Sequence, residues 1–293
     1  MSFILTILLD GVAFGMVLFI ISVGLTVTMG LMRVVNLAHG AFAMVGGYLT
    51  AELTSNGVFG VQLSFLPAAL MGAVAAGILG GLAEMTVYRP LYRKGELAQV
   101  LLTIGLVFIA IAALALIFGN NYTTIKMPAY LDGMVDLGFR DYPTYRIFVI
   151  GVGLFLALIL WLVIDRSLFG ARLRAAVDNP SMARVVGIDV NRLFTITFVC
   201  GCGLAGFGGA IGVGMLPLEA SYPLRYLVLF LIVVIVGGEG SFKGSFVAAI
   251  SLGIIETAGK FLVPTYATFI LYGVVFVMLL LRPNGLLPPK SAA

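Results

Sequence analysis

The stretch RSLFGARLRAAVDNPSMARVVGIDVNR, residues 166–192, is a polar and basic insert in a chain that is otherwise mostly apolar. Hydrophobic residues make up 61% of the chain and charged residues 10%, and the mean hydropathy is +1.14. A chain of this composition has too little polar surface to cover a soluble globule. The sequence therefore predicts an integral membrane protein in which residues 166–192 lie outside the membrane.

Apolar runs bounded by polar residues, proline or glycine predict the membrane segments. The second, seventh and eighth runs are short, which is typical of half-helices, re-entrant segments or steeply tilted helices. We expect an all-α, polytopic transmembrane bundle of about eight or nine segments, forming one transmembrane domain over residues 1–293. The runs are Phe3–Leu31, Leu37–Ala51, Phe65–Val87, Ala98–Phe118, Ile147–Ile164, Leu193–Leu216, Tyr226–Val236, Phe246–Ile255 and Phe261–Leu281.

Basic residues predict the orientation of this bundle. Twelve Lys and Arg residues fall in loops on the side of the insert, and five fall on the other side. Cytoplasmic loops carry an excess of Lys and Arg, so the insert is predicted to be cytoplasmic, with the N-terminus outside and the C-terminus inside. Residues 119–145 then form the largest external loop. In these positions the basic residues report orientation, not affinity for nucleic acid.

Within the insert, Asn179 and Pro180 predict the start of a helix, because Asn caps a helix and Pro fits its first turn. Gly187 predicts its end, and Gly170 is expected to be a second helix stop upstream. A helix of about seven residues is too short to be stable alone in water. We therefore expect it to lie on a partner surface, contacting it through Met182, Val185 and Val186.

Charge supports the same interpretation of the insert. Arg184 lies on the predicted short helix, and Arg172 and Arg174 precede it. An ordinary cytoplasmic loop whose arginines only set the topology is the alternative. Topology needs only a few basic residues, however, and does not need a capped helix, so the pattern favours a coupling helix that contacts a cytoplasmic partner.

Several kinds of chemistry are excluded by the residues themselves. The run GEGSFKGS, Gly238–Ser245, has Lys before Gly, so it does not form a phosphate-binding loop of the GxxxxGK[ST] type. Its glycines are expected to let the backbone turn at a broken helix. The single histidine cannot build a metal site, and no nucleophile–base pair is evident. We expect no enzyme activity and no cofactor or metal bound by this chain.

A few polar residues inside apolar runs are candidates for a translocation pathway, since ionisable groups in a membrane are costly. Asn36 and His39 precede a short run, and His39 is either a hydrogen-bonded helix-start residue or a group that lines the pathway. Glu52 and Glu256 occupy equal positions in two runs that align without a gap, HGAFAMVGGYLTAEL and KGSFVAAISLGIIET. Glu84 lies about one helical turn before Tyr88 and Arg89 and is expected to pair there, at the cytoplasmic interface.

Five motifs in order resemble the permease subunit of high-affinity branched-chain amino-acid ABC importers, and the chain is similar to the shorter of the two permeases that such importers use. The resemblance spans nearly the whole chain. The motifs are VNLAHGAFAMVGGY at Val35–Tyr48, YRPL at Tyr88–Leu91, RAAVDNPSMARVVGIDVNR at Arg174–Arg192, VIVGGEGSFKGS at Val234–Ser245 and RPNGL at Arg282–Leu286.

The resemblance implies a bacterial inner-membrane complex. Its other members would be a second, homologous permease subunit, two cytoplasmic ATPase subunits that use ATP, and a periplasmic solute-binding protein that delivers branched-chain or related amino acids. The short helix of the insert would dock on an ATPase subunit. The residues implied in this coupling are Arg174, Asp178, Asn179, Pro180, Met182, Arg184, Val185 and Gly187.

Two alternatives stay open at this point. The same subunit could carry urea, short amides or other small organic solutes, because specificity would lie chiefly in the binding protein. A stand-alone secondary transporter is the alternative from another class. Such proteins usually place ionisable residues near the middle of their spans, whereas here these residues cluster towards the segment ends.

Overall fold

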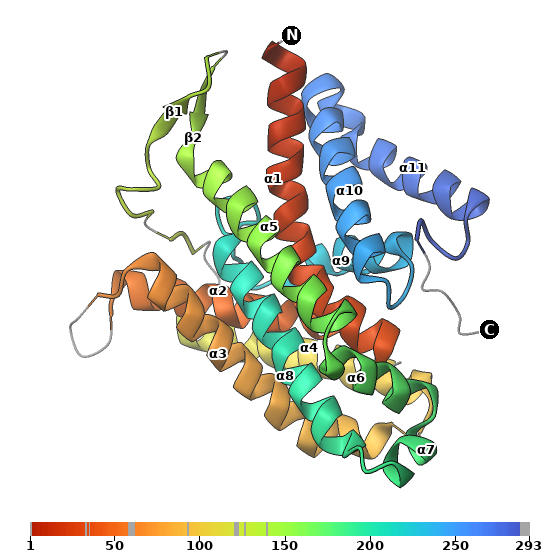
Figure 1. The fold of residues 1–293 in the computed structure, drawn as a ribbon. Helices are drawn as coiled ribbons and strands as arrows, with labels where there is room; N and C mark the ends of the chain where they lie inside the picture. The colour runs from red at the N-terminus through yellow and green to blue at the C-terminus, as the bar shows by residue number, and fades with distance from the viewer. Residues whose placement is uncertain are drawn as a thin grey trace.

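The computed structural model describes residues 2–32, 34, 36–57, 62–92, 94–119, 123–125, 127–138 and 140–287, which are mainly helical (Figure 1). Two short antiparallel strands, β1 (Met134–Asp136) and β2 (Asp141–Pro143), form a hairpin. The α-helices are α1 (Ser2–Leu25), α2 (His39–Ser55), α3 (Phe65–Ala83), α4 (Glu96–Phe118), α5 (Thr144–Asp165), α6 (Leu168–Asp178), α7 (Pro180–Val185), α8 (Val190–Ile211), α9 (Tyr222–Gly237), α10 (Phe242–Leu262) and α11 (Ala267–Leu281).

The all-α, polytopic class is confirmed, and each predicted apolar run corresponds to a helix. Among the described residues, seven helical segments are long and apolar enough to cross a membrane, namely those built on α1, α3, α4, α5, α8, α10 and α11. The helix α10 has 21 residues and is longer than the run predicted for it. By contrast, α2 and α9 have 17 and 16 residues, about 25 Å of helix against a hydrocarbon core of about 30 Å.

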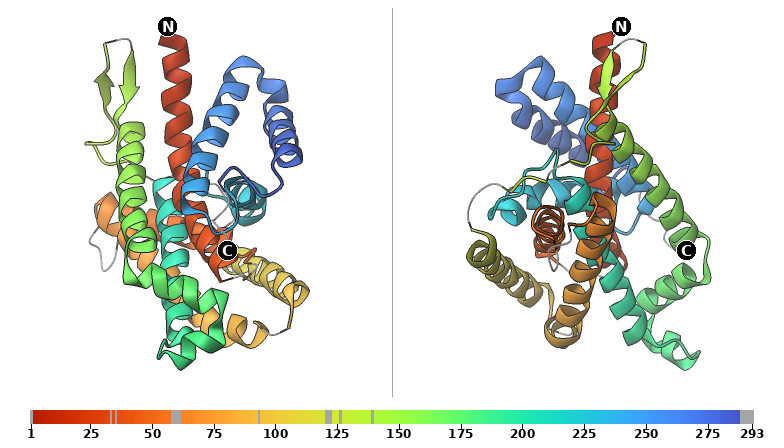
Figure 2. Two further views of the ribbon diagram at one scale, coloured as in Figure 1. Left: turned by 45° about the vertical axis from the view of Figure 1, so that its right-hand side comes forward. Right: turned by 90° about the vertical axis from the view of Figure 1, so that its left-hand side faces the viewer.

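The first helix, α1, forms the centre of the bundle (Figures 1 and 2). In the apolar part of its span 67% of the residues are buried within the subunit, against 17% for α4, α5 and α11. It packs closely on α10, where a Cβ on Gly253 would lie 2.4 Å from the carbonyl oxygen of Gly11. Small residues at such contacts let helix backbones approach each other in lipid. The faces of α4, α5 and α11 are therefore left for lipid or partner subunits.

Two of the sequence motifs meet at the end of α9. Beyond α11, Leu286 donates its backbone N–H to the carbonyl of Val236 at 2.7 Å, and Leu287 donates to Gly237 at 3.3 Å. These bonds satisfy carbonyls that a helix end leaves open. Between α9 and α10 the chain turns through Gly238 and Gly240, whose φ values are +97° and +77°. The turn predicted for this glycine run is confirmed, and the terminal RPNGL motif packs against it.

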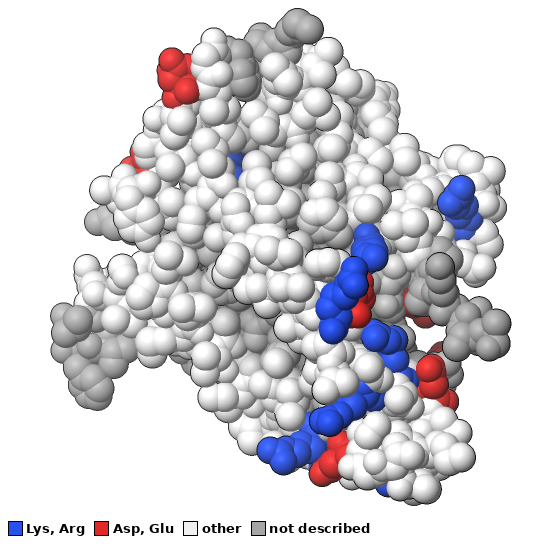
Figure 3. All heavy atoms as spheres, in the orientation of Figure 1, with Lys and Arg blue, Asp and Glu red and all other residues white. Residues whose placement is uncertain are grey.

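The β-hairpin and the polar insert lie at opposite ends of the molecule, as both views in Figure 2 show. They are joined by α5, whose 22 residues span about 33 Å. On the face drawn in Figure 3, most basic side chains gather in the lower half, over α6 and the adjoining ends of α5 and α8. On this face positive charge is thus concentrated at the end of the bundle that carries the insert.

Candidate functional site

The insert folds into two helices. Ser167 caps α6, its Oγ accepting the backbone N–H of Phe169 at 3.1 Å. The expectation that Gly170 is a helix stop is wrong: it lies in the first turn of α6, where a Cβ would sit 1.8 Å from the carbonyl oxygen of Ile164. Glycine is needed there for close packing of α6 on the end of α5.

The short helix predicted within the insert is present as α7. The Oδ1 atom of Asn179 accepts the backbone N–H of Met182 at 3.0 Å, and Pro180 occupies the first turn. At the other end Gly187 has φ +84°, and its N–H bonds to the carbonyl of Arg184 at 3.0 Å. The predicted helix start and end are both confirmed. Each follows from the intrinsic conformational preferences of Asn, Pro and Gly.

One edge of this helix is apolar and exposed. Met182, Val185 and Val186 are 63%, 80% and 72% exposed, while Ala183 is buried against the rest of the chain. Within the described residues nothing covers this edge. A six-residue helix gains too little from its own hydrogen bonds to be stable alone, and exposed apolar groups outside the lipid favour a protein contact.

The other residues predicted for coupling lie close to α7. Arg174, on α6, donates from Nη1 to the carbonyl oxygen of Ile164 at 2.8 Å, which ties α6 to the end of α5. Asp178 is exposed at the end of α6, and Arg184 is exposed on α7. The insert is thus braced on α5 and leads directly into α8, which Asp189 caps through the N–H of Arg192 at 3.0 Å.

The expected pairing of Glu84 with Arg89 is confirmed. Glu84 is fully buried, and Arg89 donates from Nη2 and Nε to its two carboxylate oxygens at 2.9 and 3.2 Å. A π-helical turn at Glu84–Tyr88 brings positions i and i+5 together. Tyr92 donates to the same carboxylate at 2.9 Å. Burial and the neighbouring carboxylate raise the pKa of Tyr92, so its hydroxyl stays protonated and keeps donating.

Neither Tyr92 nor the fourth member of this cluster, Thr195, was predicted from the sequence. The hydroxyl of Thr195 donates to Oε2 of Glu84 at 2.7 Å, and Nη2 of Arg89 lies 2.6 Å from its Oγ1. Thr195 belongs to α8, six residues after the cap at Asp189. The only sequence signal was a polar residue near the start of an apolar helix. The cluster links the first turns of α8, next to the insert, to the end of α3.

Asn36 and His39 are both fully buried at the start of α2. The Nε2 atom of His39 lies 2.8 Å from the carbonyl oxygen of Ile21, and the hydroxyl of Tyr88 donates to Oδ1 of Asn36 at 2.8 Å. Among the described residues, Nδ1 of His39 and Nδ2 of Asn36 have no hydrogen-bond partner. Both side chains contact neighbouring helices, and their role in a pathway stays a prediction.

Glu52 and Glu256 have local partners. Glu52 accepts a hydrogen bond of 2.8 Å from Nδ2 of Asn56, one turn further along the chain. Glu256 pairs with Lys260 at 2.9 Å on α10. The aligned runs that contain the two carboxylates both begin at a helix start, α2 and α10. Their place in a pathway also stays a prediction.

A second ionic cluster lies at the hairpin end. Asp10 of α1 is almost fully buried, pairs with Arg146 at the start of α5, and accepts the hydroxyl of Tyr142 at 2.8 Å. Burial and this hydrogen bond raise the pKa of Tyr142, so the hydroxyl remains a donor. An acidic residue in the first apolar run was the signal for this cluster, which fixes the hairpin to the central helix.

These features define a polytopic membrane bundle with a short, exposed helix beside its basic end, and no group of metal-binding side chains among the residues described. The chain belongs to the family described as branched-chain amino acid transport system / permease component, which matches residues 7–280. It is therefore a multi-pass transport permease.

Relatives support the family over nearly the whole chain. It is 27% identical to the high-affinity branched-chain amino acid transport permease BraD of Pseudomonas aeruginosa, over 96% of this chain and 94% of that protein. It is 26% identical to the branched-chain amino acid transport permease LivH of Escherichia coli K12, over 95% of this chain and 93% of LivH. For LivM of the same strain the identity is 28%, over 93% of this chain but 68% of the relative. No solved structure matches the chain.

Proposed function

We propose that this chain is the translocation subunit of an ATP-driven importer for branched-chain or related amino acids, and that α7 is its contact with an ATPase subunit. The observation that carries the proposal is the exposed apolar edge of Met182, Val185 and Val186 on a capped helix beside the basic end of the bundle. An ATPase surface with an apolar seat and acidic groups would cover this edge and pair with Arg184.

In this proposal, movement of α7 reaches the membrane helices through α8 and its contacts with the end of α3. Only a few residues separate α7 from α8, and α8 is joined to the end of α3 through Thr195 and the buried Glu84 carboxylate. Helices are stiff, so a push on α7 moves α8 together with α3. ATP-driven closure of the ATPase pair would reorient the bundle through these elements.

In this proposal the insert faces the cytoplasm, the hairpin faces the periplasm, and the N-terminus lies outside. The basic side chains gathered around α6 support this orientation. A second permease subunit completes the pathway, and a periplasmic binding protein delivers the solute. The names of BraD and LivH, branched-chain amino-acid permeases, support the choice of solute.

The decisive experiment is reconstitution of the chain with the second permease, the ATPase and the binding protein of the proposed importer. We expect ATP hydrolysis that is stimulated by the binding protein loaded with leucine, isoleucine or valine, together with uptake of the amino acid into vesicles. Uptake driven by an ion gradient with the isolated chain would instead identify a secondary transporter. If ATP hydrolysis were stimulated only by a binding protein loaded with urea or a short amide, the chain would still be the translocation subunit, but of an importer for that solute.

A further inference from the structure

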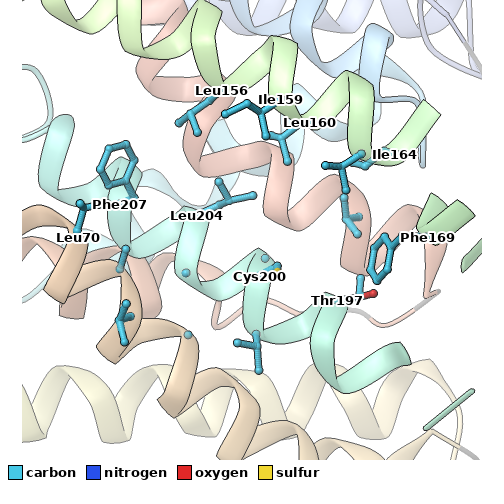
Figure 4. A pocket seen from close by; sticks show the side chains of 18 of the residues that line it. Leu70, Leu156, Ile159, Leu160, Ile164, Phe169, Thr197, Cys200, Leu204 and Phe207 are labelled. Carbon is cyan, nitrogen blue, oxygen red and sulfur yellow. The ribbon is translucent and has the colours of Figure 1, made fainter. Parts of the chain in front are cut away.

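An apolar groove of about 580 Å³ opens on the side of the bundle between α3, α5 and α8. Figure 4 shows Leu156, Leu160 and Ile164 of α5 facing Cys200 and Leu204 of α8 across this space. Phe169 of α6 closes one end. Apart from the thiol of Cys200, Thr197 contributes the only polar side chain among the residues that line it.

The length of the groove along α5 is close to the thickness of one leaflet of a bilayer. On α5 it extends from Leu156 to Ile164, next to the last residue of the helix. These positions cover about 12 Å of helix, and half of the hydrocarbon core is about 15 Å. Along α5 the groove therefore runs from the end that adjoins the insert to near the middle of the helix.

Two basic residues lie close in sequence to the groove-lining residues at the end of α5 and in α6. Arg166 follows α5 directly, and its guanidinium lies 5.0 Å from the ring centre of Trp161. Arg172 is exposed on α6, three residues after the groove-lining Phe169. Among the described residues no carboxylate pairs with either arginine, while the nearby Asp165 is within 3.9 Å of Lys243. A tryptophan beside arginines is typical of the membrane–water interface.

We propose that this groove binds an anionic phospholipid of the leaflet next to the insert, with one acyl chain between α5 and α8 and the phosphate at Arg166 and Arg172. In the orientation proposed above this is the cytoplasmic leaflet. An amino-acid zwitterion does not fit the groove, because its two charges would be desolvated without polar partners. An acyl chain needs no such partners, and basic pockets at the cytoplasmic side of membrane helices suit acidic headgroups.

The single tryptophan of the chain allows a direct test. Trp161 follows the groove-lining Leu160 on α5 without lining the groove itself, and a brominated acyl chain in the groove would pack beside the same helix turn and quench its fluorescence. The purified full chain in phosphatidylcholine vesicles is titrated with dibrominated phosphatidylglycerol, and separately with dibrominated phosphatidylcholine. We expect half-maximal quenching at a mole fraction at least about fivefold lower for phosphatidylglycerol, since each arginine near the surface contributes roughly that factor.

Substitutions separate the contribution of the lipid headgroup from the contribution of the acyl chain in the groove. Arg172→Gln should reduce the preference about fivefold, and Arg184→Gln, on α7 outside the groove, should leave it unchanged. Val74→Phe and Cys200→Phe fill the groove from the α3 and α8 walls, and either should abolish selective quenching. Val228→Phe, on the exposed side of α9, is the matched control.

Three results would overturn the proposal. Equal quenching by the two lipids in the wild-type chain would remove headgroup selection, and this comparison depends on no variant. A preference that survives both groove-filling variants would place the lipid elsewhere. Loss of all quenching when the chain is reconstituted with its partner permease would show that a protein segment, and not a lipid, occupies the groove.

Discussion

Thr195 and Glu84 lie 111 positions apart in the chain and share a hydrogen bond of 2.7 Å. The bond joins α8, which follows the insert, to the end of α3. Glu84 is fully buried, and a buried carboxylate is stable only when its oxygens are paired. Arg89, Tyr92 and Thr195 together supply these partners, so the cluster links α8 to the end of α3.

The link predicts that Thr195→Val destabilises the protein. Valine has nearly the same shape but leaves an oxygen of Glu84 with one donor fewer, which should cost about 1–3 kcal/mol. The melting temperature in detergent should fall by several degrees. Thr54→Val is the matched control, because the Thr54 hydroxyl bonds only within α2. Equal stability of the two variants would show that Thr195 adds nothing to the cluster.

The exposed edge of α7 predicts a selective loss of coupling. Val185→Asp would bury an unpaired carboxylate in an apolar seat on the ATPase, at a cost of several kcal/mol if the seat is dry, and Arg184→Glu reverses a charge there. Transport and recovery of the ATPase in pull-downs should drop steeply, while the bundle still inserts. The same two kinds of substitution in the hairpin, Val135→Asp and Arg140→Glu, serve as controls at the opposite end of the bundle. If both α7 variants keep the ATPase and normal solute-stimulated hydrolysis, α7 is only part of a topology-setting loop.

The orientation is tested by cysteine labelling in a background without Cys200 and Cys202. A cysteine at Ala175 of α6 should be protected from an impermeant thiol reagent in intact cells, and one at Asp132 should react, because both side chains are exposed at opposite ends of the bundle. Permeabilised cells should label at both positions. The reverse pattern in intact cells would invert the topology, and equal labelling would reject it.

The burial of His39 predicts a stability effect. His39→Leu removes the hydrogen bond to the carbonyl of Ile21, which should cost about 1–3 kcal/mol, and His39→Gln, which can still donate, should recover part of this loss. Melting temperature and solute uptake are measured on the same preparations. A variant that melts like the wild type but transports poorly would support the pathway role instead, and Asn36→Leu should then behave in the same way.

The sequence predicted the features of the structure that depend on the conformational preferences of neighbouring residues. Asn179, Pro180 and Gly187 set the ends of α7 through capping and backbone preferences, and apolar runs located the helices. Glu84 and Arg89 are near in sequence, so their pairing was also predictable. The prediction for Gly170 was wrong because glycine occurs both at helix ends and at sites of close backbone packing. Only the folded structure, in which Gly170 packs against the Ile164 carbonyl, distinguishes the two cases.

Contacts between distant residues could not be predicted. Thr195 reaches Glu84, and Tyr142 reaches Asp10 of α1, only after the bundle has assembled. Periodicity cannot identify such partners, because in a membrane bundle the apolar surface that faces lipid resembles the surface that faces another helix. The groove between α3, α5 and α8 is equally invisible in the sequence, since its walls come from three separate segments.

The hydrogen bond from Leu286 to Val236 has a consequence for biosynthesis. The residue that closes α9 is made roughly fifty residues after it, once α10 and α11 have been translated. Until then the open carbonyls of α9 must be satisfied by water or by the insertion machinery, because unpaired backbone groups are not tolerated in lipid. The final depth of this short helix is therefore fixed late, in the same step that brings the end of α11 back to the bundle.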